Sequence, residues 1–284
     1  MNYLLFNAFA DGGKGEESAK EALKILQEKI GETTLKALVG LDVKSFLKEL
    51  KKDDKAIILG GDGTLNHFIN ELGEEQLPCS FYLYPSGTGN DFLNDVKDKE
   101  DPETHLVELN GFITNLPYVE VKGKTYRFIN GIGFGIDGEC CVEAERKKKE
   151  GETEIDYAKI TIGLLLGRFK APLSTVKVDG EELQFKKTYI AAAMNGRFYG
   201  GGMNVAPEQE RGSGLLSLAV IHGRGKIGTL MLFPKLFKGT HVKSKKAVYI
   251  KKGKEIEVTF SLPTALQIDG EVVEGVTTYK AYIK

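Results

Sequence analysis

The sequence has little that would tie the chain to a bilayer, to a nucleic acid or to secretion. Among its 284 residues, no segment approaches the twenty apolar residues that span a membrane. The 39 Lys and Arg residues nearly balance the 40 Asp and Glu residues, and a formal net charge of -1 gives no field to gather a polyanion. Nucleic acid is therefore not an expected partner. The N-terminus has no basic lead and only a short apolar run, which argues against a secretion signal.

Cysteine is also scarce. The three cysteines are Cys79 and the adjacent pair Cys140 and Cys141. Neighbours in sequence rarely form a disulfide or share a metal ion, so a reducing cytoplasm is the expected compartment. The histidines show no Cys/His spacing typical of zinc, and the sequence has no evident repeat or low-complexity segment.

The first part of the chain alternates short apolar runs with segments of helical period. The expected elements are strands at 3–6, 35–39, 56–59 and 81–84 and helices at 17–30, 43–50 and 65–72. Repeated β-α order with right-handed crossovers predicts an open parallel sheet that has helices on both faces. We expect this α/β domain to cover residues 1–112.

From about residue 105 the pattern changes to short strands with frequent glycines, which predicts a β-sandwich over residues 113–275. Two helix-like stretches interrupt it. The charge run at 143–150, followed by an apolar segment at 160–170, is typical of a solvated helix face. The stretch 227–246 mixes apolar residues with lysines. It is either a core-packing helix with a wet face or a segment that docks at an anionic membrane surface.

A glycine-rich turn lies between a predicted strand and a predicted helix. It consists of Gly60, Gly61, Asp62, Gly63 and Thr64. Glycines let backbone N–H groups approach an anion closely, and a helix N-terminus adds about half a positive charge. The turn is therefore a candidate phosphate site, with polar groups for phosphate or magnesium in its Asp and Thr. A purely structural turn is the alternative, because glycine turns in this context are common.

A second polar loop, at 85–92, follows the next predicted strand and contains Ser86, Gly87, Thr88 and Asn90. In an open parallel sheet, both turns would lie at the same edge. Ligands of such sheets bind in the crevice outside the carboxyl ends of the strands.

Five segments in fixed order resemble the diacylglycerol kinase catalytic-domain family, which includes bacterial lipid kinases and sphingosine kinases. The segments are 60–66 (GGDGTLN), 85–92 (PSGTGNDF), 131–137 (GIGFGID), 199–207 (YGGGMNVAP) and 267–271 (QIDGE). The resemblance implies an α/β nucleotide-binding domain like that of NAD kinases and phosphofructokinases, followed by a β-sandwich. It also implies that residues 276–284 return to the first domain as a strand, and that the reaction takes place in the cleft between the domains.

The same resemblance implies ATP and Mg²⁺ as cofactors. The residues expected to contact the nucleotide are Asn7, Gly60, Gly61, Asp62, Gly63, Thr64, Asn66, Gly87, Thr88 and Asn90. Asp62 and Asp91 would hold the ATP-bound magnesium, since Mg²⁺ takes one or two carboxylates and keeps several waters. An alternative for Asp91 is to cap the turn or the following helix.

The resemblance also implies that Glu271 is the general base and that Asp62 is the second catalytic residue. Gln267, Asp269 and Glu271 alternate, so an extended segment would place them on one face. In phosphoryl transfer the alcohol loses its proton late, so a well-placed carboxylate suffices. The alternative for Asp269 and Gly270 is a simple hairpin turn.

The chain departs from the family at three places. Ser213 and Ser217 stand where acidic residues help to hold a structural magnesium, which argues against an occupied metal site there, since main-chain oxygens near Glu210 and Leu215 are weak partners for a hard cation. His67 replaces a glutamate. A threonine is missing from residues 39–42, so the affinity for ATP or the choice of nucleotide can differ.

These observations predict an ATP-dependent lipid kinase, with diacylglycerol as the expected substrate. The enzyme would be cytoplasmic and would bind the membrane surface transiently, and an exposed face of the sandwich could pair two copies. The alternatives are an enzyme like NAD kinase or phosphofructokinase, and a lipid or nucleotide sensor that has lost a metal site and does not catalyse.

Overall fold

The chain forms two compact units, Met1–Leu116 and Pro117–Lys284. The computed structural model describes residues 1–87, 90–152 and 155–284, without the side chains of residues 11 and 12. The division lies close to the boundary expected at residue 112. None of the helices in the described ranges is both long and apolar enough to cross a bilayer.

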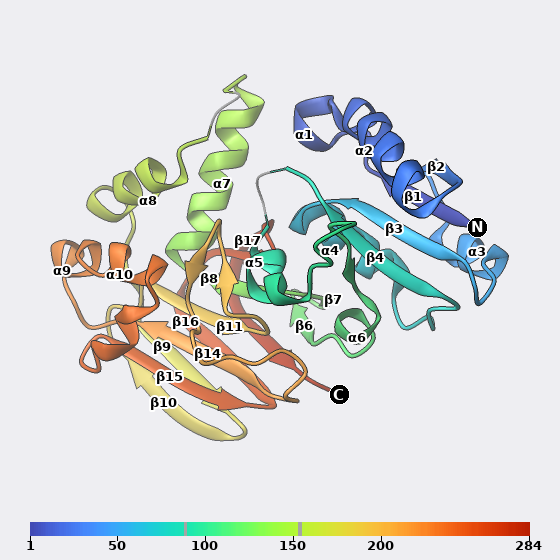
Figure 1. The fold of residues 1–284 in the computed structure, drawn as a ribbon. Helices are drawn as coiled ribbons and strands as arrows, with labels where there is room; N and C mark the ends of the chain where they lie inside the picture. The colour runs from blue at the N-terminus through green and yellow to red at the C-terminus, as the bar shows by residue number, and fades with distance from the viewer. Residues whose placement is uncertain (88–89, 153–154) are drawn as a thin grey trace. The chain divides into compact units, whose positions relative to one another are not determined.

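The first unit is built on a five-stranded sheet in the order β2-β1-β3-β4-β5 (Figure 1). Four strands run parallel and β5 pairs antiparallel with β4. The strands are β1 (Asn2–Phe6), β2 (Thr33–Ala37), β3 (Lys55–Gly60), β4 (Ser80–Pro85) and β5 (Val107–Glu108). The helices are α1 (Ala10–Gly13), α2 (Gly15–Ile30), α3 (Val43–Glu49), α4 (Asp62–Leu72), α5 (Asp91–Val96) with the 3-10 turn Lys97–Lys99, and α6 (Asn110–Ile113).

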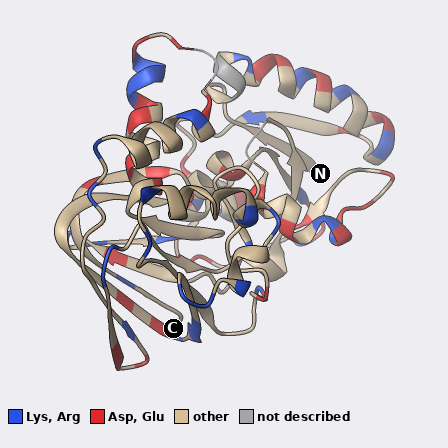
Figure 2. Ribbon diagram, turned by 90° about the vertical axis from the view of Figure 1, so that its left-hand side faces the viewer, with Lys and Arg blue, Asp and Glu red and all other residues tan. Residues whose placement is uncertain are grey.

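Burial on both faces of this sheet explains its continuous apolar strands. In β1, Leu4 and Phe6 pack in one cluster with α2, and Leu5, which points to the opposite face, is also fully buried. Such strands are typical of parallel sheets that are covered on both sides. Helix α2 contributes Ala19 and Leu26, two turns apart, and its outer face alternates acidic and basic residues (Figure 2).

The second unit is a β-sandwich with helices on one side. Its main sheet has the order β15-β14-β11-β8-β16-β17-β6-β7, and β9 pairs with both β16 and β10. The strands are β6 (Tyr118–Val121), β7 (Lys124–Arg127), β8 (Gly131–Phe134), β9 (Ser174–Val178), β10 (Glu181–Phe185), β11 (Ile190–Met194), β12 (Phe198–Tyr199), β13 (Met203–Asn204), β14 (Leu216–Ile221), β15 (Val248–Gly253), β16 (Glu255–Ile268) and β17 (Glu271–Tyr282). The helices are α7 (Ile136–Lys149), α8 (Tyr157–Leu166), α9 (Lys226–Leu230), α10 (Phe233–Phe237) and the 3-10 turn Thr240–Lys243.

The central strand β11 shows how the layers are formed. Ala191 and Ala193 point into a core that is formed mainly by strand residues. Ala192 and Met194 point into a second core, which includes residues of α7, α8 and α10. The period of two places successive side chains in different layers. Small alanines allow both layers to approach this strand closely.

The expected return of residues 276–284 to the first domain differs from the pairing in the structure. These residues belong to β17, which pairs antiparallel with β16 and, through Tyr279–Tyr282, with β6. Val276 and Tyr279 are buried in the core of the second unit. The apolar residues at the end of the chain therefore complete the sandwich.

Candidate active site

Three polar loops of the first unit start at the same edge of its sheet. β1, β3 and β4 are adjacent and parallel, and their last residues are in register, with Phe6 opposite Leu59 and Gly60 opposite Pro85. The loops that begin at Asn7, at Gly61 and at Ser86 therefore leave the carboxyl ends of three neighbouring strands. This confirms the expectation that the glycine-rich turn and the second polar loop share one edge.

The glycines of the first turn have different roles. A Cβ atom added to Gly60 would lie 2.6 Å from Cβ and Oγ1 of Thr64, so a side chain is excluded where the strand meets helix α4. Around Gly63, by contrast, an added Cβ would meet no described atom within 4 Å beyond its chain neighbours and the backbone of its own helix. Among the described residues, no side chain therefore covers this position in the first turn of α4. The first N–H groups of any helix lack intrahelical acceptors and favour anions.

Asp62 connects the two loops. Its Oδ2 atom accepts a hydrogen bond from the backbone N–H of Asp91 at 2.7 Å, and its Oδ1 atom accepts one from Phe92 at 2.9 Å. The carboxylate therefore acts as an acceptor for the first turn of α5. A carboxylate oxygen can accept more than one interaction, so these two bonds do not by themselves exclude a cation. The magnesium role of Asp62 stays a prediction, and the structure adds a positioning role.

The second loop is folded around Asn90. Its Nδ2 group donates to the main-chain oxygen of Gly87 at 2.9 Å, and Gly87 has a φ of +82°, which favours glycine. The Oδ1 atom of Asn90 is buried, with no hydrogen-bond partner among the described residues. Asp91 is 5% exposed. A buried acceptor of this kind fits a ligand that brings a cation or a donor. Thr88, also predicted here, lies outside the described residues.

Asn7 organises the first loop. Its Oδ1 atom accepts a hydrogen bond from Phe9 N at 3.0 Å. Its main-chain oxygen would lie 2.0 Å from a Cβ added to Gly15, so the start of α2 needs a glycine to approach the loop. Asn66, another predicted contact, is buried on α4 and its main-chain oxygen accepts from Asn70. His67 is exposed on the same helix, so it is not a packing residue.

In the second unit, the segment around Glu271 is a hairpin and not a continuous extended run. Ile268 pairs with Glu271, and Asp269 and Gly270 form the two-residue turn with φ values of 47° and 98°. The expected alternation of three side chains on one face is therefore wrong, because the chain reverses at Asp269. Glu271 begins β17 and is exposed, and its carboxylate has no hydrogen-bond or ion-pair partner in the described parts of the chain.

The carboxylate of Asp269 has a structural role. It accepts hydrogen bonds from the backbone N–H groups of Ile129 at 2.6 Å, Asn130 at 2.8 Å and Gly131 at 2.9 Å. Bonds to an ionised acceptor are stronger than neutral ones. This aspartate therefore fixes the hairpin turn beside Glu271 to the segment that leads into β8.

Asp137 is a candidate that the residue-by-residue analysis missed, although it ends the 131–137 motif. It is buried at the start of α7, and burial raises its pKa to about 6 despite the nearby hydroxyl of Tyr199 and amide of Gln267, which act to lower it. Neither carboxylate oxygen has a partner within hydrogen-bond geometry in the described chain. A Cβ added to Gly133 would lie 1.5 Å from Asp137 Oδ2 and 2.7 Å from Gln267 Nε2, so glycine makes room for this cluster.

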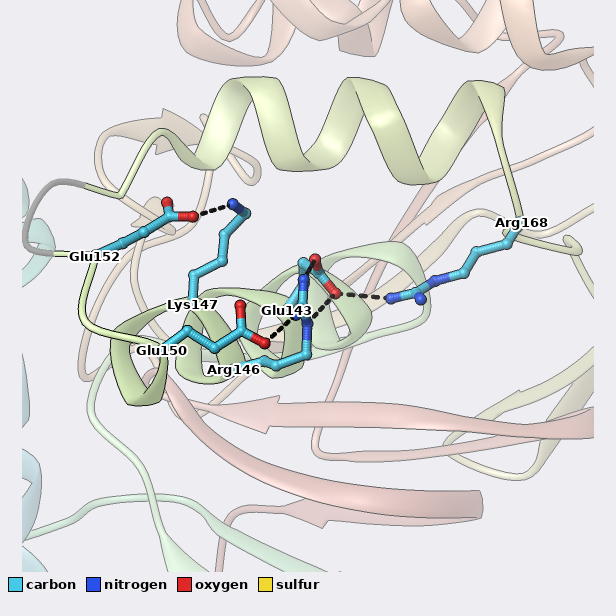
Figure 3. Close-up of polar contacts among 6 residues, drawn as sticks. All are labelled: Glu143, Arg146, Lys147, Glu150, Glu152 and Arg168. Carbon is cyan, nitrogen blue, oxygen red and sulfur yellow. Dashed lines mark hydrogen bonds and ion pairs between the residues drawn. The ribbon is translucent and has the colours of Figure 1, made fainter.

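The charge run on α7 is neutralised by its own neighbours, as expected for a solvated helix face. Glu143 pairs with Arg146 at 2.6 Å and with Arg168 at 2.8 Å, and these cations hold the pKa of the Glu143 carboxyl below its usual value (Figure 3). Lys147 pairs with Glu152 at 2.6 Å. Glu143, Lys147, Glu152 and Arg168 line a cavity of about 630 Å³ between α7 and α8. Since these four side chains are engaged in ion pairs, we assign the cavity no reaction.

Models of known protein families match the two parts of the chain separately. A model of the diacylglycerol kinase catalytic domain matches residues 2–121, and a model of the YegS C-terminal NAD kinase beta sandwich-like domain matches residues 130–281. The chain belongs to the diacylglycerol kinase catalytic-domain family. The first matched range contains the three loops, and the second contains Asp137 and Glu271.

Relatives in this family differ widely in sequence. A Mycobacterium tuberculosis protein named diacylglycerol kinase is 25% identical over 198 residues, which cover 68% of this chain and 62% of that protein. A Stenotrophomonas maltophilia protein named "Probable lipid kinase YegS-like" is 26% identical over 231 residues, 78% of this chain and 74% of that protein. The crystal structure of a diacylglycerol kinase from Bacillus anthracis has a TM-score of 0.69 at 21% identity, with 99% of this chain and 93% of that chain covered. This structural likeness shows the fold.

Proposed function

We propose that this family member is an ATP-dependent lipid kinase that transfers the γ-phosphoryl group to a lipid hydroxyl, with diacylglycerol as the first candidate substrate. The observation that carries the proposal is the meeting of three polar loops at the carboxyl ends of β1, β3 and β4. Asp62 joins two of these loops by hydrogen bonds. The carboxyl ends of the strands are the edge at which open α/β sheets bind their ligands.

The residues of the first unit would bind the triphosphate. Backbone N–H groups of 61–64 and the N-terminus of the 11-residue helix α4 would face the phosphates, and no described side chain covers the position of Gly63. Asp62, Asp91 and the buried Oδ1 atom of Asn90 supply oxygen ligands of the kind that magnesium prefers. When bound, magnesium would offset the charge on the phosphate oxygens.

Glu271 would accept the proton of the lipid hydroxyl. Its carboxylate is exposed and free of partners within the described chain, whereas the nearby Asp269 is fully occupied by backbone N–H groups. A general base needs to lie within hydrogen-bond reach of the proton, and in a loose phosphoryl-transfer transition state its pKa matters less. The position of Glu271 at the tight end of a hairpin limits its backbone motion.

Access to a lipid would be given by an exposed apolar surface, the α8–α9 patch, formed by Leu166, Ile227 and Met231. These side chains are 51%, 72% and 61% exposed. Lys226 Nζ joins the two helices by donating to the main-chain oxygens of Leu166 at 3.2 Å and Gly167 at 2.6 Å. The next helix, α10, exposes further apolar and basic side chains. Apolar residues with flanking lysines favour an anionic membrane surface.

The test is an assay of the purified chain with γ-labelled ATP against diacylglycerol, monoacylglycerol, ceramide and sphingosine in mixed micelles, with NAD and fructose 6-phosphate as non-lipid acceptors. We expect label in a chloroform-soluble phospholipid product. Labelled NADP or sugar bisphosphate would instead establish the NAD kinase-like or phosphofructokinase-like alternative. ATP binding without any transfer would establish the sensor.

A further inference from the structure

The turn between β13 and β14 is held by a buried glutamine. Gln209 is 4% exposed, and its Nε2 group faces three main-chain oxygens, those of Leu215 at 2.8 Å, Glu210 at 3.2 Å and Asn195 at 3.4 Å. Its Oε1 atom accepts a hydrogen bond from Ser217 Oγ at 2.7 Å, and Ser217 is 1% exposed. The amide therefore satisfies oxygens from both ends of the turn at once.

Converging carbonyl oxygens are the usual ligands of a hard cation. The family resemblance implies a structural magnesium at this turn, but the residues present do not fit one. Ser213 and Ser217 carry no charge, and within the described ranges no group of three His, Cys, Asp or Glu side chains could hold a metal. The oxygens of Glu210 and Leu215 already accept from the Gln209 amide. A cation would have to displace this group without gaining a carboxylate.

We propose that the Gln209 side chain replaces the structural metal ion of this turn, so that the second unit is stable without magnesium. The two N–H donors of the Gln209 amide take the place of the positive charge that a cation would offer to the main-chain oxygens. Its Oε1 atom also accepts the hydrogen bond of Ser217. The turn thus has neutral serines at 213 and 217 and a neutral donor at Gln209. The charge of the buried turn stays balanced without an ion.

The Gln209 turn is connected by hydrogen bonds to the segment that holds the hairpin of Glu271. From the Gln209 contact at Asn195, hydrogen bonds continue through Asn195 Nδ2 to Ile129 O at 2.9 Å and through Asn195 N to Asn130 O at 2.9 Å. Arg211, from the same turn as Gln209, donates to Asn130 Oδ1 at 2.6 Å.

Asp269 binds the N–H groups of residues 129–131 from the other side. The Gln209 turn and the hairpin of Glu271 therefore share one backbone segment. Because Gln209 does not touch a reacting group, it is a positioning residue. The inference on stability stands without the proposed kinase activity, and only this positioning role depends on it.

The test compares the melting temperature of the nucleotide-free protein in EDTA and in about 10 mM MgCl2, a concentration above the millimolar dissociation constants of weak divalent-cation sites. We expect equal values for the wild type, and metal analysis should find no magnesium retained after gel filtration. Gln209→Ala should lower the melting temperature by roughly 5–10 °C in both buffers, since buried acceptors lose their donor.

Gln209→Glu is the decisive variant. It replaces a donor by a carboxylate that faces three oxygens, so it should melt lowest in EDTA and recover by several degrees in MgCl2 or CaCl2. Gln184→Glu, at an exposed position of β10, is the charge-matched control and should respond to neither ion. A wild-type melting temperature that rises with magnesium would overturn the proposal. This wild-type measurement decides it even where Gln209→Glu does not fold.

Because these measurements use no nucleotide and no lipid, an inactive protein with the expected melting behaviour would remove the kinase and keep the Gln209 inference. An active kinase whose wild-type melting temperature rises with magnesium would keep the kinase proposal and remove the Gln209 inference. For the positioning role, Ser217→Ala weakens the Gln209 contact without touching the hairpin. It should lower kcat while the KM for ATP stays constant.

Discussion

The two units each fix a polar loop with an aspartate, but the two aspartates differ in what they leave for chemistry. Among the described residues, the Asp62 carboxylate accepts hydrogen bonds from two backbone N–H groups, one on each oxygen. The Asp269 carboxylate accepts from three, and beside it Glu271, at the start of the next strand, has no partner in the described parts of the chain. A carboxylate used by the backbone and a carboxylate available for reaction can thus be distinguished by their hydrogen bonds.

The largest expected effect tests the free carboxylate. Glu271→Gln should lower kcat by about 10² or more, the usual scale for loss of a general base, and should leave the Kd for ATP unchanged. Glu274→Gln, an exposed position on the same strand β17, is the matched control and should keep wild-type turnover. Steady-state kinetics and a nucleotide-binding titration measure both. Equal turnover in both variants would remove Glu271 from the mechanism.

The next effect concerns the occupied carboxylates. Asp269→Asn should lower the free energy of unfolding by about 2–4 kcal/mol, because the amide retains one acceptor oxygen for three N–H groups. Asp62→Asn, with two N–H groups to satisfy, should cost about 1–3 kcal/mol. Urea unfolding monitored by circular dichroism gives both values. A larger loss for Asp62→Asn would reverse the ranking that the hydrogen bonds predict.

Asp62→Asn also separates its two roles. A variant that binds ATP and magnesium normally but unfolds earlier would assign Asp62 to loop positioning alone. A variant that loses the magnesium dependence of nucleotide binding, in addition to stability, would support the predicted metal contact.

Asp137 extends the comparison to a buried carboxylate whose two oxygens accept no hydrogen bond of good geometry in the described parts of the chain. Its pKa is raised from 3.8 to about 6 by burial, so between these values the unfolded chain ionises while the folded chain keeps its proton. The contribution of Asp137 to stability therefore falls as pH rises from about 4 to 6, by at most about 1.4 kcal/mol per pH unit, and this contribution is constant above. Asp137→Asn should remove this slope. The free energy of unfolding of the wild type and of Asp137→Asn is measured over about pH 4–7, the range of this titration. Parallel curves for the two proteins would contradict a raised pKa of Asp137.

The sequence alone was enough for the parallel α/β sheet and the sandwich, since hydrophobic period and strand-ending glycine turns are local signals. It also located the loops that begin at Gly61 and Ser86 at one edge, because parallel strands share their direction, whereas Asn7 was expected near the nucleotide only from the family resemblance. The partners of Asp62 and Asp269 could not be predicted. Each binds N–H groups far away in sequence, and no local pattern encodes such a pairing.

The errors have physical reasons too. Residues 267–271 alternate as a strand would, but Asp269 and Gly270 adopt positive φ values and reverse the chain. Residues 276–284 continue β17 because their apolar side chains fill the sandwich. Gln209 gave no signal, since a glutamine between two glutamates is ordinary on a surface. Its meaning comes from its burial among main-chain oxygens.

The smallest effect tests a contrast between the surfaces of the two units. In the first unit Val39 is 46% exposed, whereas Ile227 and Met231 of the second unit belong to the α8–α9 patch, where Lys226 lies between the helices. If the patch docks at a membrane, the double variant Ile227→Glu and Met231→Glu should bind vesicles with 30% phosphatidylglycerol about tenfold more weakly, since it loses apolar contact and gains repulsion. Val39→Glu, which adds a charge elsewhere, should bind like the wild type.

Sedimentation with these vesicles and with pure phosphatidylcholine measures the difference, and a short-chain diacylglycerol dispersed without a bilayer supplies the control for catalysis. The double variant should keep its turnover on the dispersed substrate and lose it on vesicles, because the patch contributes access to the lipid and no chemistry. Loss on both substrates would mean that the patch belongs to the reaction site. Loss on neither would leave Ile227 and Met231 as apolar residues without a membrane role.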